Sequence, residues 1–102
     1  MKKIALFCSA GMSTSLLVTK MEEAVAAQGI DVSIMAYPEA EMAERIEGID
    51  VVLIGPQIRY VLNRAKKLCD AQGVPVAVIN TMDYGTMDGK KVLAQAMGMM
   101  NL

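Results

Sequence analysis

Short apolar runs recur along the chain, each separated from the next by a longer stretch of mixed composition. Four of them stand out, at residues 4–7, 31–37, 51–54 and 76–79. All but residues 31–37 are continuously apolar, which is typical of strands that are covered on both faces. The pattern therefore predicts four strands, three of them covered on both faces.

The stretches between these runs carry apolar residues at helical spacing. One stripe comprises Leu16, Leu17, Met21, Ala24 and Val25, and a later one comprises Ile58, Val61, Leu62, Ala65, Leu68 and Cys69. Each of these two stretches ends in the tripeptide AQG, which places Gly29 and Gly73 where a left-handed residue ends a helix. A shorter helix is predicted at residues 39–47, and a last one over residues 90–99.

Strands that alternate with helices of this length predict an α/β fold of order βαβαβαβα. The expected architecture is a four-stranded parallel sheet with helices on both faces, formed by one domain over residues 1–102. Ligands of such folds bind beyond the carboxyl ends of the strands, where the strand order reverses. Cys8 immediately follows the first predicted strand, so a phosphate-binding loop is expected there, with residues 55–60 and 80–89 as neighbours.

Composition narrows the classes of function. A formal net charge of -1 argues against nucleic acid as a partner. No apolar run approaches the roughly 18 residues of a membrane span, so no membrane insertion and a cytoplasmic location are expected. Two cysteines without secretion features suggest reduced thiols. Because the chain contains no His, we expect no metal, and we expect no cofactor.

The most informative segment follows the first predicted strand, where a thiol precedes seven mostly small residues. Backbone N–H groups of such a strand-to-helix loop can surround an anion, and they also favour a thiolate over a thiol. Cys8 is therefore predicted to be a nucleophile, the alternative being a small buried residue at a strand end. The predicted phosphate-binding residues are Ser9, Ala10, Gly11, Met12, Ser13, Thr14 and Ser15.

Several familiar phosphate loops do not match this segment. It lacks the lysine of a nucleotide triphosphatase loop, and the chain has no G-x-G-x-x-G fingerprint. The nearest competitor resembles low-molecular-weight tyrosine phosphatases, in which five residues separate the cysteine from an arginine. Position 14 is a threonine here. Without the arginine that stabilises a transferring phosphoryl group, the loop fits reversible carriage of phosphate on sulfur.

Three segments carry a resemblance to a known family: LFCSAGMSTSLLV at residues 6–18, VVLIGPQIRY at 51–60 and MDYGTMDG at 82–89. Together they resemble the B component (IIB) of the bacterial phosphoenolpyruvate-dependent sugar phosphotransferase system, in its lactose/cellobiose/chitobiose branch. The resemblance spans essentially the whole chain. It implies the four-stranded parallel α/β fold.

The same resemblance implies a relay in which Cys8 carries a phosphocysteine. The donor would be a phosphohistidine on the IIA component. The acceptor would be a sugar, such as cellobiose, chitobiose or lactose, that enters through the membrane IIC component. Residues 9–15 would correspond to the loop around the phosphate. A monomer that docks transiently on its partners suits this role.

Two other classes of function stay open at this point. A phosphatase-type enzyme would hydrolyse phosphoesters unaided, and a regulatory module would carry phosphate on Cys8 as a signal.

Other conspicuous residues have simpler interpretations. Asp83 and Asp88 are interpreted as turn and cap residues, Cys69 as a core thiol, and Tyr37, Tyr60 and Tyr84 as packing residues.

Overall fold

A four-stranded parallel sheet forms the centre of the molecule. The computed structural model describes residues 1–9 and 12–100. The strands are β1 (Lys2–Cys8), β2 (Val32–Pro38), β3 (Val51–Ile54) and β4 (Val76–Val78). They lie in the order β2-β1-β3-β4, and each pair of neighbours is parallel. All four predicted strands are confirmed, with bounds shifted by two residues or fewer.

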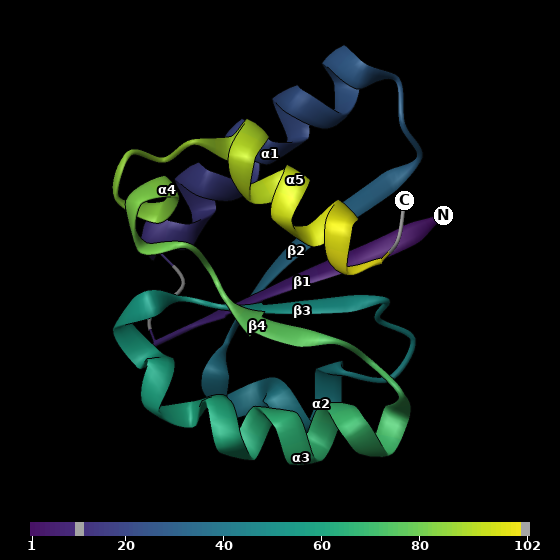
Figure 1. The fold of residues 1–102 in the computed structure, drawn as a ribbon, viewed down its shortest axis with the longest axis vertical. Coiled ribbons are helices and arrows are strands. Elements are labelled where there is room, and N and C mark those ends of the chain that lie inside the picture. The colour runs from purple at the N-terminus through teal and green to yellow at the C-terminus, as the bar shows by residue number, and fades with distance from the viewer. Residues whose placement is uncertain (10–11, 101–102) are drawn as a thin grey trace.

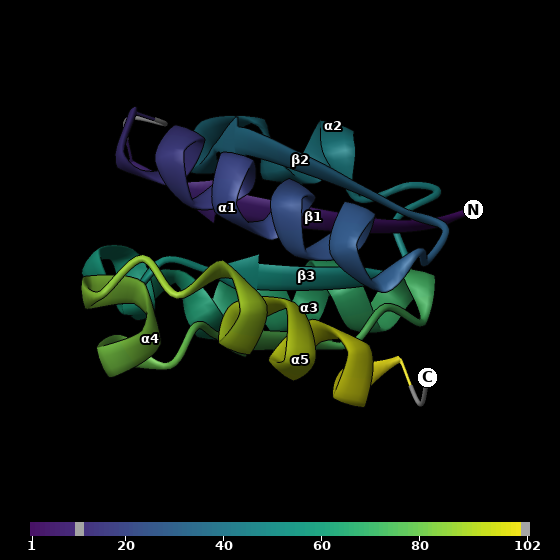
Figure 2. The same cartoon turned by 90° about the horizontal axis from the view of Figure 1, so that it is seen from above.

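Helices cover both faces of this sheet, as predicted. They are α1 (Met12–Gln28), α2 (Met42–Arg45), α3 (Leu62–Gln72), α4 (Thr81–Gly85) and α5 (Gly89–Met99), with the 3₁₀ helices η1 (Glu39–Glu41) and η2 (Pro56–Val61). Figures 1 and 2 show α1, α4 and α5 on one side of the sheet and α2 and α3 on the other. Helix α1 packs against α5 along this first side.

The apolar runs are continuous because each central strand contributes to two cores. On β1, Ile4 and Leu6 face the core beneath α1 and α5, whereas Ala5 and Phe7 face the core above α2 and α3. All four of these side chains are fully buried. Burial of a side chain the size of Leu, Ile or Phe contributes roughly 1.5–3 kcal/mol to stability, so both layers hold β1 in place.

The helix ends follow the predicted glycine signals. Gly29 and Gly73 have φ values of 64° and 69°, in the left-handed region that glycine enters without steric cost. Each glycine lies directly after the last residue of its helix, α1 or α3. The two AQG tripeptides therefore act as predicted.

The segments after the later strands differ from the prediction. The stripe that begins at Ile58 is not one helix, since η2 precedes α3 and Ile58 itself has non-helical angles of φ -117° and ψ 30°. Residues 80–89, expected as a loop that neighbours Cys8, contain the short helix α4. That helix begins at an N-cap, because Asn80 Oδ1 accepts hydrogen bonds from the backbone N–H groups of Met82 and Asp83.

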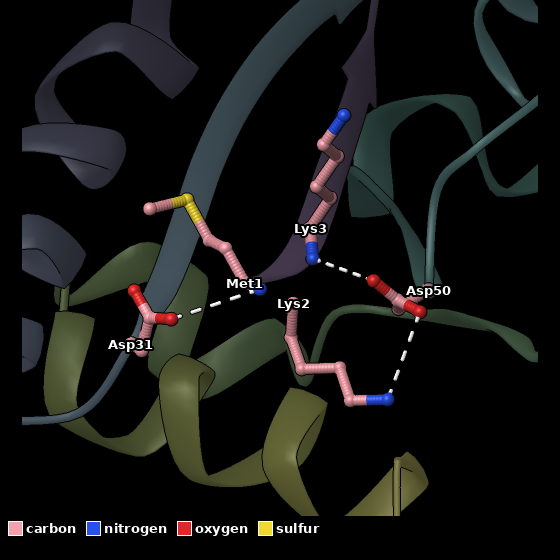
Figure 3. Close-up of polar contacts among 5 residues, drawn as sticks. All are labelled: Met1, Lys2, Lys3, Asp31 and Asp50. Carbon is pink, nitrogen blue, oxygen red and sulfur yellow. Dashed lines mark hydrogen bonds and ion pairs between the residues drawn. The ribbon is translucent and has the colours of Figure 1, made fainter.

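Exposed polar contacts join the strands at their amino ends, as Figure 3 shows. The amino group of Met1 lies 3.6 Å from Asp31 Oδ2, directly before β2. The backbone N–H of Lys3 donates to Asp50 Oδ2 at 2.8 Å, and Lys2 Nζ lies 3.9 Å from Asp50 Oδ1, directly before β3. These contacts align the start of β1 with both neighbours, at the edge opposite Cys8.

Among the described residues, no helix combines the length and the apolar character that a bilayer crossing requires.

Candidate functional site

Cys8 lies where the strand order reverses. It is the last residue of β1 and not, as predicted, the first residue after that strand, because β1 continues its pairing with β2 as far as Cys8 and Pro38. Strand β2 flanks β1 on one side and β3 flanks it on the other. The crevice at such a reversal is where open α/β sheets bind ligands.

The Cys8 side chain is nearly enclosed, with an exposed fraction of 3%. Its Sγ lies 3.0 Å from Oγ1 of Thr14, and either atom can be the donor. Thr14 is itself fully buried. A hydroxyl that donates a hydrogen bond to sulfur stabilises the thiolate, whereas the same oxygen accepts a hydrogen bond from the S–H group when the sulfur is protonated. Thr14 thus contacts the proposed nucleophile directly.

The predicted loop is shorter than expected. Residues 9–15 were expected to join a strand to a helix, but α1 already begins at Met12. The second half of the segment therefore forms the first turn of the helix. Ser9 and Ser15 are exposed, and the Ser15 carbonyl accepts a hydrogen bond from Thr19 Oγ1 at 3.2 Å.

The remaining predicted loop positions cannot be placed in the same way. Ala10 and Gly11 lie outside the described residues, as do the side chains of Met12 and Ser13.

The helix start at Met12 places the amino end of α1 close to Cys8 in sequence. The N–H groups of the first turn of any α-helix point toward its amino end, and the helix dipole adds partial positive charge there. In α1 this end follows Cys8 by four positions. An anion attached to Cys8 therefore lies on the side of α1 that favours negative charge.

Segment 55–60 reaches the same place from β3. The backbone N–H of Gly55 donates to the Phe7 carbonyl at 2.9 Å, which continues the pairing of β1 and β3. A Cβ built on Gly55 would lie 3.7 Å from Cys8 Cβ and 3.1 Å from Oε1 of Gln57. Sequence reasoning placed this segment beside the thiol but did not single out Gln57, because no motif marks an isolated glutamine.

Of the two carboxylates in residues 80–89, Asp88 is the cap residue that was predicted, whereas Asp83 is neither a turn nor a cap residue, because it lies within α4. Asp88 is the N-cap of α5, where its Oδ1 accepts from the backbone N–H of Lys91 at 3.1 Å. Asp83 lies in the first turn of α4, where negative charge suits the helix dipole.

Cys69, the second thiol, is fully buried on the face of the sheet that α2 and α3 cover. Burial and the neighbouring Asp70 carboxylate raise the pKa of the Cys69 thiol to about 11. Its prediction as a core thiol is confirmed.

The tyrosines divide into two groups. Tyr84 is buried, and the ring of Tyr37 lies 5.8 Å from that of Phe7, as expected of packing residues. The prediction is wrong for Tyr60, which is 74% exposed. The exposed large apolar side chains of the described residues also include Leu16 and Met82, on α1 and α4.

Comparison with known proteins identifies relatives along the whole chain. Residues 3–95 match the family described as "PTS system, Lactose/Cellobiose specific IIB subunit". The galactose-specific EIIB component of Lactococcus lactis subsp. cremoris (strain MG1363) is 46% identical, covering 98% of this chain and 97% of that protein. The oligo-beta-mannoside-specific EIIB component of Bacillus subtilis (strain 168) is 45% identical at the same coverage.

Solved structures agree with the fold. The solution structure of the cellobiose-specific IIB component from Borrelia burgdorferi superposes with a TM-score of 0.82 at 41% identity, covering 98% of this chain and 92% of that one. The lactose-specific IIB domain from Streptococcus pneumoniae has a TM-score of 0.86 at 15% identity, covering 95% of each chain, and supports the fold alone. The chain belongs to the lactose/cellobiose-specific IIB family of the sugar phosphotransferase system.

Proposed function

We propose that Cys8 carries the phosphoryl group in a two-step relay. The group arrives from a phosphohistidine on the IIA component and leaves to a sugar presented by the membrane IIC component. The observation that carries this proposal is the position of Cys8, at the strand-order reversal and 3.0 Å from the Thr14 hydroxyl, in a member of the IIB family. Because its partners act at the inner side of the membrane, the protein works in the cytoplasm.

The first step forms a bond between Cys8 Sγ and phosphorus. The thiolate attacks in line as the bond from phosphorus to the histidine nitrogen breaks, and the electron pair of that bond stays on the nitrogen. The proton lost from the thiol balances the proton gained by the imidazole. A thiolate is a strong nucleophile, so the step needs no general base from this chain.

The second step reverses the role of sulfur. The sugar hydroxyl oxygen attacks phosphorus, the S–P bond breaks, and its electron pair returns to Cys8. The hydroxyl proton leaves to a base of the membrane component or to water. Backbone N–H groups of residues 9–15 hold the phosphoryl oxygens through both steps, which supplies positioning and electrostatic stabilisation.

The threonine at position 14 favours carriage over hydrolysis. An arginine at this place would stabilise the transition state for attack by water, and its loss lowers the rate by orders of magnitude. Thr14 instead contacts the sulfur. The phosphocysteine therefore persists until an acceptor docks.

The sugar is proposed from the relatives. The Lactococcus lactis and Bacillus subtilis proteins are named for galactose, cellobiose and oligo-beta-mannoside. We therefore assign a β-linked disaccharide as the substrate class of this chain, with cellobiose, chitobiose and lactose as the sugars to test first.

Intact mass spectrometry tests the relay. Wild type and Cys8→Ser are incubated with phosphoenolpyruvate, the general phosphotransfer proteins and a cognate IIA component. One labile phosphoryl adduct is expected on wild type and none on the variant. If wild type forms no adduct but hydrolyses an aryl phosphate in a Cys8-dependent manner, the protein is a phosphatase and the relay is wrong.

A further inference from the structure

The surroundings of Gly55 suggest a role for one more residue, Gln57, in the proposed reaction. We propose that the side-chain carboxamide of Gln57 donates a hydrogen bond to the phosphoryl group on Cys8, and that Gly55 leaves the space in which the two meet. This inference rests on the proposed phosphocysteine. It makes Gln57 a catalytic residue that contacts the group being transferred.

The Gln57 carboxamide and the Cys8 side chain both lie near the position where Gly55 lacks a Cβ. A Cβ on Gly55 would touch both Gln57 Oε1, at 3.1 Å, and Cys8 Cβ, at 3.7 Å. The carboxamide and the cysteine side chain thus both lie beside the position that a Cβ of residue 55 would occupy, as does the Phe7 carbonyl oxygen at 3.4 Å. Because Gly55 has no side chain, nothing of its own separates them.

The backbone does not explain why position 55 is a glycine. Its φ and ψ are -61° and 141°, in the extended region that any residue adopts and that a residue before a proline prefers. What an alanine would change is the space, since its Cβ would press on the Gln57 carboxamide. The missing side chain, and not conformational freedom, is therefore the useful property of Gly55.

The carboxamide of Gln57 is available for a ligand. Gln57 is exposed, and within the described part of the chain its side chain takes part in no hydrogen bond. Gln95 provides the contrast. Its Oε1 accepts from the backbone N–H of Asn80 at 3.1 Å, and its Nε2 donates to the Val78 carbonyl at 3.0 Å. Gln95 therefore has a structural role that Gln57 lacks.

A neutral donor suits the chemistry of this sulfur. A phosphoryl group presents several negatively charged oxygens, and each amide N–H directed at them stabilises the charge that they carry during transfer. A carboxamide offers two such N–H groups, and rotation about its last side-chain bond turns them toward the space beside Cys8. With no arginine at position 14, Gln57 supplies a neutral side-chain donor at the sulfur.

Single-turnover transfer from phosphorylated IIA at saturating concentration tests Gln57. Gln57→Ala is expected to lower the rate by at least about 10-fold, and by up to the roughly 100- to 1,000-fold that removal of one oxyanion-hole donor costs. Gln57→Glu is expected to lower it further, because a carboxylate repels the phosphoryl oxygens. Gln72→Ala, at the exposed end of α3 and the opposite edge of the sheet, is the matched control and should transfer at the wild-type rate.

A double-mutant cycle separates this role from general disturbance of the site. Gly55→Ala is expected to fold with unchanged melting temperature and to slow transfer, because the methyl group displaces the carboxamide. In the Gln57→Ala background the same change should cost little. A wild-type rate for Gln57→Ala, or an equal cost of Gly55→Ala in both backgrounds, overturns the proposal. Failure of wild type to form any Cys8 adduct would instead refute the relay itself.

Discussion

Thr14 is the residue through which α1 reaches the sulfur of Cys8. Its hydroxyl contacts Sγ at 3.0 Å, and both side chains are shielded from water. A hydrogen bond to a charged group contributes roughly 1.5–3 kcal/mol, which corresponds to about 10- to 100-fold in rate when only the thiolate reacts. The contact is therefore large enough to affect the first transfer measurably.

We predict that Thr14→Val, which keeps the shape but removes the hydroxyl, lowers phosphorylation of Cys8 by IIA about 10-fold or more. Thr14→Ser keeps the hydroxyl and should retain most of the rate. Alkylation of Cys8 by iodoacetamide at pH 7 provides an independent measure of thiolate reactivity and should follow the same order. Equal rates for the valine and serine variants would contradict the role assigned to the hydroxyl.

Cys69 gives the molecule a stability that depends on pH. Its pKa is raised from 9.0 to about 11 in the folded state, mainly by burial. Above pH 9 the unfolded chain releases this proton while the folded chain retains it, so stability falls as pH rises from about 9 to about 11. The loss due to Cys69 is expected to reach roughly 2–3 kcal/mol.

Urea denaturation of wild type and Cys69→Ala at pH 8 and pH 10.5 measures this loss. The variant should be less stable at pH 8, and the difference between the two proteins should shrink at the higher pH. A constant difference would show that Cys69 ionises equally easily in both states.

At the scale of elements, the start of α5 depends on its contact with α1. A Cβ on Gly89 would lie 2.4 Å from the backbone carbon of Lys20, too close for any side chain. Gly98, in the same helix, has nothing within 4 Å of its Cβ position. The two glycines therefore form a matched pair of packed and open positions.

We predict that Gly89→Ala destabilises the fold by about 1–3 kcal/mol, since it overpacks a fixed contact between two backbones. Gly98→Ala should be neutral or stabilising by up to about 1 kcal/mol, because alanine has the higher helix propensity. Chemical denaturation of both variants decides the matter. A neutral Gly89→Ala would mean that α5 shifts freely on α1.

The elements also show what a sequence can and cannot predict. Apolar runs located all four strands. The continuous runs of the central strands β1 and β3 reflect burial between two helical layers, whereas the edge strands β2 and β4 are mostly half-buried. Helix α4 was missed since its five residues are too few for a periodic signal, and a local cap from Asn80 starts it. The same limit applies to the candidate site. Cys8 was identified from its neighbours in sequence, whereas the position of Gln57 beside Cys8 results from the conformation of η2 after Gly55.

At the scale of the whole molecule, three of the four large apolar side chains that are exposed among the described residues lie at one edge, and the fourth, Met1, lies at the amino ends of the strands. Leu16, Tyr60 and Met82 are 51%, 74% and 75% exposed, and they stand on α1, η2 and α4. These elements follow β1, β3 and β4, so all three residues lie at the carboxyl edge that contains Cys8, as Figure 2 shows for the elements. Any donor that brings phosphorus within bonding distance of Cys8 must cover part of this edge.

We predict that this apolar edge docks the IIA component. Tyr60→Ser and Met82→Ser should each raise the KM for phosphorylated IIA about 5- to 10-fold, because truncation of an apolar anchor weakens binding. The rate at saturation should stay near that of wild type, in contrast to Gln57→Ala, which lowers the rate itself. Gln28→Ser, an exposed change at the far end of α1, serves as the control. If these variants keep the wild-type KM for phosphorylated IIA but fail to deliver the phosphoryl group to the sugar, the apolar edge binds the membrane component instead. The two partners would then bind different surfaces around Cys8.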